Sequence, residues 1–155
     1  RSWLGGHERL FPHLASRLAP GGVLACQMPV SFVAPQHALM RETAADGPWT
    51  QALADVEGVK PLGSTADYYD WLSPLCREVE IWTTTYLHVL TGEDPVVDWM
   101  LGTGLRPYVD ALSDPEQRAS FLSAYRARVA QAFPRRPDGA TLLPFERLFV
   151  VARRA

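Results

Sequence analysis

A dense apolar run over residues 23–28 constrains the fold of this chain more than any other stretch. It follows the turn sequence Pro20-Gly21-Gly22, shows no alternation of apolar and polar positions, and ends at Pro29. Such a run between turn signals is typical of a strand covered on both faces, as in a parallel sheet packed between helices. We therefore expect 23–28 to be a buried strand and the chain to have an α/β fold.

Two further segments are predicted to be strands. From Glu78 to Leu90, β-branched and aromatic residues are frequent and side chains alternate along the segment. One face of this strand is expected to carry Val79, Ile81, Thr83, Thr85, Leu87 and Val89. A second dense apolar run covers 148–152. We expect 78–90 and 148–152 to pair antiparallel beside 23–28.

Apolar spacing and cap signals predict the helices. The expected segments are 7–18, 34–45, a short helix capped by Ser64 and Asp67, 94–101, and a helix that begins in the sequence Ser113-Asp-Pro-Glu116. The last two lie in 91–140, between the final two strands. We expect 91–140 to be a helical insertion that forms a lid over the substrate, since long inserts can cover a ligand site.

Length and composition are those of an ordinary globular domain. The chain has 155 residues, 47% of them hydrophobic and 21% charged, and a formal net charge of −2, which argues against a nucleic-acid partner. No apolar segment approaches the roughly 20 residues that cross a bilayer, and no secretory signal is present. Cys26 and Cys76 follow no spacing motif, as expected of reduced thiols in a cytoplasmic protein.

Several segments resemble class I S-adenosylmethionine-dependent methyltransferases. The sequence "LAPGGVLACQMP" is similar to the fifth strand of that family and its lead-in turn, and "WLGGHERLFPHL" to the segment that leaves the fourth strand. The resemblance extends over essentially the whole chain through "HALMRETA", "YYDWLSP", "EVEIWTTTYLHVL", "DWMLGTGLRP" and "RLFVVARR". It implies the C-terminal part of a Rossmann-like fold, ending in an antiparallel strand pair with a helical insertion between the two strands.

The donor-binding loop of that family has no counterpart in this sequence. There is no G-x-G-x-x-G, and Gly102-Thr-Gly104 is expected to end a helix rather than to open one. The chain begins at Arg1. We therefore expect 1–155 to be the C-terminal half of a single methyltransferase domain, inactive alone, with S-adenosylmethionine as methyl donor and its main binding loop upstream.

The resemblance further implies an acceptor of small polycarboxylic acid type, with transfer of a methyl group to one carboxylate and a monomethyl ester as product. A carboxylic acid titrates near pH 4, so its oxygen is already an anionic nucleophile and needs no general base. The residues to seek are therefore anion-binding residues. Two alternatives stay open: a methyltransferase for another small molecule, and a non-catalytic partial domain that associates with proteins through the strand edge at 23–28.

Arginine is the natural partner of a carboxylate because its guanidinium binds both oxygens. Arg106 is the first candidate: it precedes Pro107, so we expect extended backbone on a loop, although a solvated loop arginine is an equally good interpretation. His37 and Arg41 lie four residues apart on one predicted helix face, so both can point at one ligand. The alternative for Arg41 is an ion pair with an acid on a partly exposed face.

Three further residues are candidates for binding the substrate. Gln27 lies near the carboxyl end of the run 23–28, where doubly wound sheets place their ligands, although a bond to neighbouring backbone would also satisfy it. Tyr69 and Trp99 can form pocket walls, although aromatic residues at such spacings are more often core. The remaining histidines are dispersed and follow no metal-ligand pattern, so no metal is expected.

Overall fold

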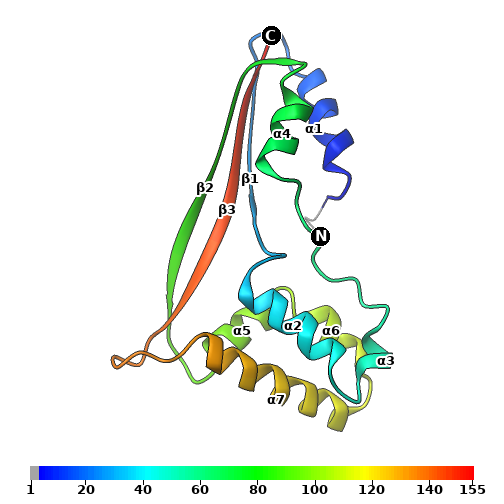
Figure 1. The fold of residues 1–155 in the computed structure, drawn as a ribbon, viewed down its shortest axis with the longest axis vertical. Coiled ribbons are helices and arrows are strands. Elements are labelled where there is room, and N and C mark those ends of the chain that lie inside the picture. The colour runs from blue at the N-terminus through cyan, green and yellow to red at the C-terminus, as the bar shows by residue number, and fades with distance from the viewer. Residues whose placement is uncertain (1–3) are drawn as a thin grey trace. The chain divides into compact units, whose positions relative to one another are not determined.

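The structure is a computed structural model that describes residues 4–155; residues 1–3, the start of the predicted 1–155 domain, lie outside the described residues. The elements are, in chain order, α1 (His7–Ser16), β1 (Val23–Pro29), α2 (Pro35–Ala45), α3 (Thr50–Leu53), α4 (Thr65–Leu72), β2 (Cys76–Leu90), α5 (Pro95–Leu101), α6 (Arg106–Ala111), α7 (Pro115–Ala132) and β3 (Thr141–Arg154) (Figure 1). They belong to two compact units, one of 4–30, 60–86 and 145–155, the other of 31–59 and 87–144.

The three strands form one antiparallel sheet in the order β1-β3-β2, with β3 in the centre (Figure 1). In the β1–β3 pair, Val23 lies opposite Arg153 and Cys26 opposite Val150. The prediction that 78–90 and 148–152 pair antiparallel beside 23–28 is confirmed. Both strands are longer than predicted, because β2 begins at Cys76 and β3 at Thr141.

The prediction that β1 is buried on both faces is wrong. Its inward side chains Leu24, Cys26 and Met28 pack against a core of residues from α1, α4 and β3. The alternate side chains face away from this core, and Val23 and Gln27 are exposed. Successive side chains of a strand point to opposite faces, and in the first unit helices cover only one face of β1. An apolar run therefore continues onto a face that this unit leaves uncovered.

The core of the first unit is centred on aromatic residues of α1 and α4. Phe11 packs edge to face against Tyr68, with ring centroids 4.9 Å apart, and both side chains are buried. The Tyr68 hydroxyl lies 2.6 Å from Nδ1 of His7. The predicted capping box begins α4: the Ser64 hydroxyl accepts from the Asp67 N–H, and the Asp67 carboxylate accepts from the Ser64 N–H. This cap fixes where α4 starts.

The face of β2 that packs on a core is not the same at the two ends of the strand. Val79 and Ile81 pack on the core of the first unit. Further along the strand, Leu87 and Val89 are 56% and 64% exposed, while Leu90 packs on the core of the second unit. The strand passes from one unit to the other near residue 87, so different cores select opposite faces.

The second unit is built from helices around one apolar core. Its fully buried members come from several helices and adjoining segments: Met40, Val96, Val97, Met100, Leu105, Leu112, Phe121, Tyr125 and Leu143. The longest helix, α7, begins where predicted, with the Asp114 side chain accepting from the Glu116 N–H. The helices α5, α6 and α7 all lie between β2 and β3. The role of 91–140 as a substrate lid stays a prediction.

Candidate functional site

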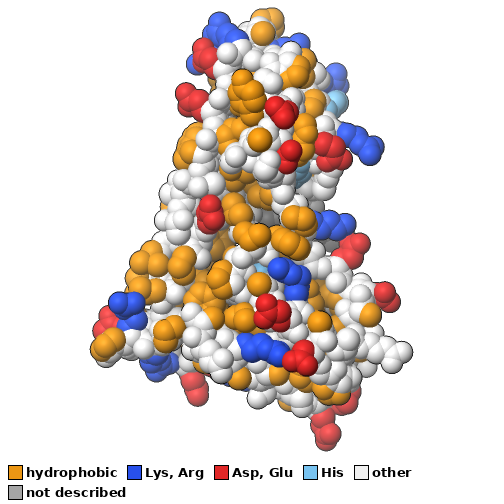
Figure 2. All heavy atoms as spheres, in the orientation of Figure 1, with side chains coloured by type: hydrophobic (Ala, Val, Ile, Leu, Met, Phe, Trp, Pro, Cys, Tyr) orange, Lys and Arg blue, Asp and Glu red, His pale blue; other side chains and the backbone are white. Residues whose placement is uncertain are grey.

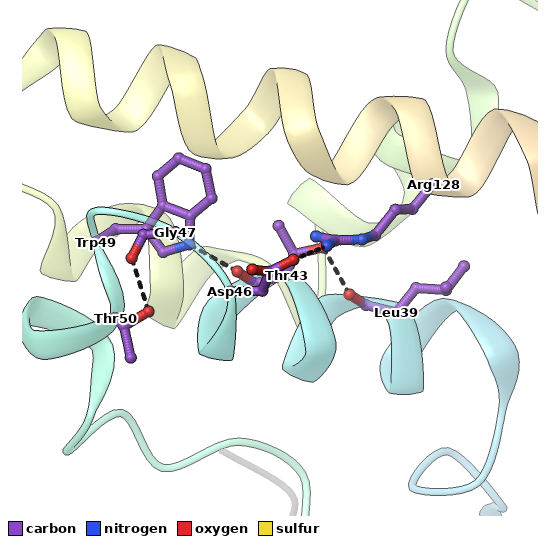
Figure 3. Close-up of polar contacts among 7 residues, drawn as sticks. All are labelled: Leu39, Thr43, Asp46, Gly47, Trp49, Thr50 and Arg128. Carbon is purple, nitrogen blue, oxygen red and sulfur yellow. Dashed lines mark hydrogen bonds and ion pairs between the residues drawn. The ribbon is translucent and has the colours of Figure 1, made fainter.

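The helix α2 carries the candidate site, and contacts at its C-terminal end fix its position. The indole of Trp49 donates to the carbonyl of Thr43 over 2.6 Å, and the Thr43 hydroxyl donates to the Leu39 carbonyl (Figure 3). Arg128 of α7 forms an ion pair with Asp46 at 2.5 Å (Figure 3). The first two bonds hold the end of α2 and the residues that follow it together, and the Arg128–Asp46 pair ties this end to α7.

The first turn of α2 is held by the same partner helix. The hydroxyl of Tyr125, a fully buried residue of α7, donates to the carbonyl of Gln36 over 3.0 Å. The side chain of Gln36 is 1% exposed, and its Oε1 has no hydrogen-bond partner. A buried polar atom without a partner is uncommon in folded proteins, so this first turn retains hydrogen-bonding capacity that the described residues do not satisfy.

His37 is the second buried polar residue of this turn. It is 5% exposed, and its Nδ1 also lacks a hydrogen-bond partner. Burial, and secondarily the positive charge of Arg41, lower the pKa of His37 to about 4. The imidazole is therefore neutral at pH 7, and one ring nitrogen donates while the other accepts. Gly104 packs directly against the ring, since a Cβ placed there would lie 2.7 Å from Cε1.

Arg41 is a half-buried cation that pairs with no acid among residues 4–155. Its Cζ lies 4.1 Å from the centroid of the Phe32 ring. The other half-buried arginines of the described chain each donate to an oxygen; they are Arg118, Arg128, Arg147, Arg153 and Arg154. The predicted alternative of an Arg41–acid pair is therefore not what the structure shows. Figure 2 shows acidic and basic side chains interspersed on the face that it draws.

Tyr108 of α6 lies within electrostatic reach of Arg41. Burial raises the pKa of Tyr108, and the charge of Arg41 acts in the opposite direction. The phenol is 4% exposed and its ring is nearly parallel to that of Phe121, at 6.3 Å between centroids. A Cβ on Gly58 would lie 2.7 Å from the Tyr108 hydroxyl. Glycine backbone thus packs against both His37 and Tyr108.

Sequence reasoning identified His37 and Arg41 but not Gln36 or Tyr108. His37 and Arg41 lie four residues apart on α2, and the charge of Arg41 contributes to the lowered pKa of His37. That both bind one ligand stays a prediction. Tyr108 lies two residues after Arg106, in a stretch that the sequence predicts to be a loop. A loop has no regular repeat, so its sequence does not indicate which side chains point to the core. A helix predicted over Arg106–Ala111 would have been the signal for Tyr108.

Arg106 lies on a helix, so the prediction of extended backbone on a loop is wrong. It is the first residue of α6, and Pro107 occupies the next position, where a helix needs no N–H donor. Its side chain is 78% exposed, and Nε lies 3.7 Å from Oδ2 of Asp110. A substrate-binding role for Arg106 stays a prediction.

The other predicted residues lie on separate elements. Trp99 of α5 and His88 of β2 pack ring against ring in the second unit, at 4.8 Å between centroids. Gln27 and Tyr69 belong to the first unit. The Gln27 side chain accepts a hydrogen bond from Nε of Arg147, and Tyr69 is 53% exposed on α4. Among the candidates, the structure brings His37 and Arg41 together.

The described residues contain no metal cluster, and the segment Gly102-Thr103-Gly104 does not have the form of a phosphate-binding loop. No group of three or more metal-binding side chains occurs among residues 4–155. Gly102 ends α5, as predicted, so Gly102-Thr103-Gly104 does not open a helix as a phosphate-binding loop does. None of the described helices has the length and apolarity needed to span a membrane.

Proteins named trans-aconitate 2-methyltransferase match nearly the whole of this chain. The protein from Paracidovorax citrulli is 49% identical over 154 residues, covering 99% of this chain and 59% of the relative. The chain is similar to trans-aconitate 2-methyltransferases. A trans-aconitate 2-methyltransferase from Methylobacterium radiotolerans is 49% identical over 99% of this chain and 60% of its own length. One from Azoarcus sp. is 49% identical over 98% and 59%.

The resemblance to methyltransferases that the sequence segments indicated is confirmed. The segments from "HALMRETA" to "RLFVVARR" also carry a narrower resemblance, to trans-aconitate 2-methyltransferases, and the matches confirm it. The chain spans about three fifths of the length of these trans-aconitate 2-methyltransferases, since it covers 59% to 60% of each. No family model matches the chain.

Proposed function

We propose that this chain is the acceptor-binding part of a cytoplasmic, S-adenosylmethionine-dependent O-methyltransferase. The enzyme transfers a methyl group to one carboxylate of a small polycarboxylic acid, trans-aconitate, and releases a monomethyl ester. The observation that carries the proposal is the similarity to trans-aconitate 2-methyltransferases over 99% of the chain. Arg41, a half-buried cation without an acid among the described residues, supports an anionic acceptor.

The proposed reaction needs no general acid or base. S-adenosylmethionine would supply an electrophilic methyl group when it is bound: the bond between its sulfonium sulfur and the methyl carbon breaks as a carboxylate oxygen bonds to that carbon. The products are a neutral thioether and an uncharged ester group, and no proton moves. A carboxylate is ionised at neutral pH because its pKa lies near 4. The residues of this chain therefore bind the anion, orient it and exclude water, and orientation alone is worth roughly 7–11 kcal/mol of a barrier.

The helix α2 provides the groups for that task. The guanidinium of Arg41 is free to bind two carboxylate oxygens, and the neutral His37 adds a hydrogen-bonding ring nitrogen one turn earlier. Arg106, Gln27, Tyr69 and Trp99 are further proposed contacts of the acceptor.

The lid and the donor site complete the proposal. Residues 91–140 are proposed to cover the bound acceptor. The donor is proposed to be bound by residues outside the 155, so this chain alone does not catalyse the reaction.

The test is methyl transfer by the full-length protein that contains this chain. The protein is incubated with methyl-labelled S-adenosylmethionine and trans-aconitate, and the products are analysed by mass spectrometry for a monomethyl ester. A neutral acceptor of similar size serves as the control. Label in the ester but not in the neutral compound supports the proposal. Transfer to the neutral acceptor with none to trans-aconitate indicates a methyltransferase for another small molecule, and no transfer to any acceptor favours a non-catalytic role.

A further inference from the structure

Resting on the proposed function, we infer that Arg41, one helical turn after the buried His37, binds a carboxylate of the acceptor that is not methylated. The carboxylate that reacts is then held by other contacts. The inference makes Arg41 the residue that selects polycarboxylates over monocarboxylates, because an acceptor with one carboxylate cannot both bind Arg41 and react.

The geometry of Arg41 leaves its hydrogen-bonding edge available. Its Cζ contacts the face of the Phe32 ring, at 4.1 Å from the centroid. Such a contact is electrostatic and uses none of the five N–H donors of the guanidinium. No described acid or carbonyl accepts from these donors. A half-buried guanidinium positioned by an aromatic face is suited to a planar, bidentate carboxylate.

The groups around Arg41 add hydrogen-bonding capacity without adding charge. His37 is buried with an unpartnered Nδ1, and the hydroxyl of Tyr108 belongs to a buried phenol. Both lie within electrostatic reach of Arg41. Gly104 and Gly58 pack against these two side chains so closely that a Cβ would lie 2.7 Å from each. One cation with two neutral polar neighbours matches the charge of one carboxylate.

The charge balance of the reaction decides which carboxylate Arg41 binds. The reacting carboxylate loses its negative charge when the ester forms. A cation bound to it would stabilise the starting anion more than the transition state, and would raise the barrier. A carboxylate that does not react keeps its charge throughout, so a cation bound to it stabilises the starting complex and the transition state equally. Such uniform binding lowers KM and leaves kcat unchanged.

The test compares Arg41→Ala with the wild-type full-length protein. With trans-aconitate we expect KM to rise about tenfold or more, as for loss of a charge-assisted pair, while kcat changes little. With crotonate, a monocarboxylate, KM and kcat are expected to stay at their wild-type values. Arg41→Lys, which keeps the charge but loses the fork, is expected to fall between. Arg17→Ala removes an exposed arginine outside the proposed lid and serves as the matched control.

Each other outcome has a defined meaning. A rise in kcat together with a raised KM would place Arg41 at the reacting carboxylate and overturn the inference. A fall in kcat at unchanged KM, or wild-type kinetics of Arg41→Ala, would overturn it as well. Circular dichroism melting of both Arg41 variants separates misfolding from lost binding.

Calorimetric titration of trans-aconitate without donor separates this inference from the proposed function. If the wild type transfers no methyl group but binds trans-aconitate and Arg41→Ala does not, the anion site stands and the proposed function fails. If the wild type binds no trans-aconitate, both fail.

Discussion

The imidazole of His37 occupies the space that a side chain on Gly104 would need: a Cβ there would lie 2.7 Å from Cε1 and 3.2 Å from Nδ1. The backbone of Gly104 is not in the left-handed region, so the glycine is required for space and not for conformation. The ring therefore has little freedom to move toward the α5–α6 turn.

Gly104→Ala is expected to lower the free energy of unfolding by about 1–3 kcal/mol, the usual range for overpacking a buried site. In a His37→Ala background the same change should cost less than about 0.5 kcal/mol, because the ring that it meets is gone. Urea unfolding of the four proteins measures both values. Gly5→Ala is the control, since nothing lies within 4 Å of a Cβ there. Equal costs in both backgrounds would show that His37 is not the obstacle.

The pKa of His37, lowered to about 4 by burial and by Arg41, predicts a loss of stability in mild acid. The pKa in the unfolded chain is about 6.5, so between these values the unfolded state binds more protons than the folded state. The stabilisation is thus present above pH 6.5 and is lost as the pH falls toward 4.

Urea midpoints at pH 7, 6 and 5 test this, with His37→Gln as the comparison. The variant should lose less stability than the wild type over this range. Parallel decline in the two proteins would exclude His37 as the titrating group. NMR of the His37 ring should show it still neutral at pH 5.5.

The capping box of α4 gives a third prediction. Ser64→Ala removes the acceptor of the Asp67 N–H at 3.1 Å and should cost about 1 kcal/mol, as for other serine caps. The Ser64 backbone N–H, and then its hydroxyl, hold the pKa of Asp67 below its usual value. That stabilisation is present above the unfolded-state pKa, about 3.9, and is lost as the pH falls below it.

Asp67→Asn should therefore flatten the acid limb of the stability curve. Asp70→Asn, on the same helix but outside the first turn, should leave the curve as it is. If both variants flatten it equally, the effect is one of net charge and not of the cap.

A fourth prediction concerns the loss of stability at alkaline pH through Tyr68. Burial, and secondarily the neighbouring Cys26, raise the pKa of Tyr68 to about 12. In the unfolded chain it is about 10, so the contribution to stability is full below pH 10 and is lost as the pH rises toward 12.

Tyr68→Phe should show a shallower loss of stability between pH 9 and 11. It should also be less stable at pH 7 by about 1 kcal/mol, because the 2.6 Å hydrogen bond with His7 is lost. Tyr69→Phe is the matched control on the same helix, since Tyr69 is 53% exposed. An unchanged alkaline limb in Tyr68→Phe would contradict the assignment. Part of the decline should remain in every variant, since burial also raises the pKa of Tyr125.

Local signals predicted the elements of this fold well, because they depend on neighbours in the chain. The capping pair Ser64–Asp67 and the proline at the start of α2 each mark a helix start that the structure contains. The alternation over 78–90 predicted β2. These signals act within a few residues, where the spacing along the sequence largely determines the distance in space.

The wrong predictions concern which other elements pack on the faces of a strand. The composition of β1 does not reveal that only one of its faces packs on α1 and α4, and the alternation in β2 does not reveal a change of core near residue 87. At the candidate site, the sequence predicted that His37 and Arg41 lie on one helix, which the structure contains. Tyr108 comes from a different helix, so only the packing of α6 shows that it lies near Arg41.

Opposite faces of β2 pack on the cores of the two units. The register of the strand is therefore fixed independently at each of its ends. A slip by one residue would turn Val79 and Ile81 to solvent at one end and withdraw Leu90 from its core at the other. Neither error could compensate for the other. A shift of β2 therefore loses buried apolar contacts at both of its ends, and the correct register in one unit favours the correct register in the other.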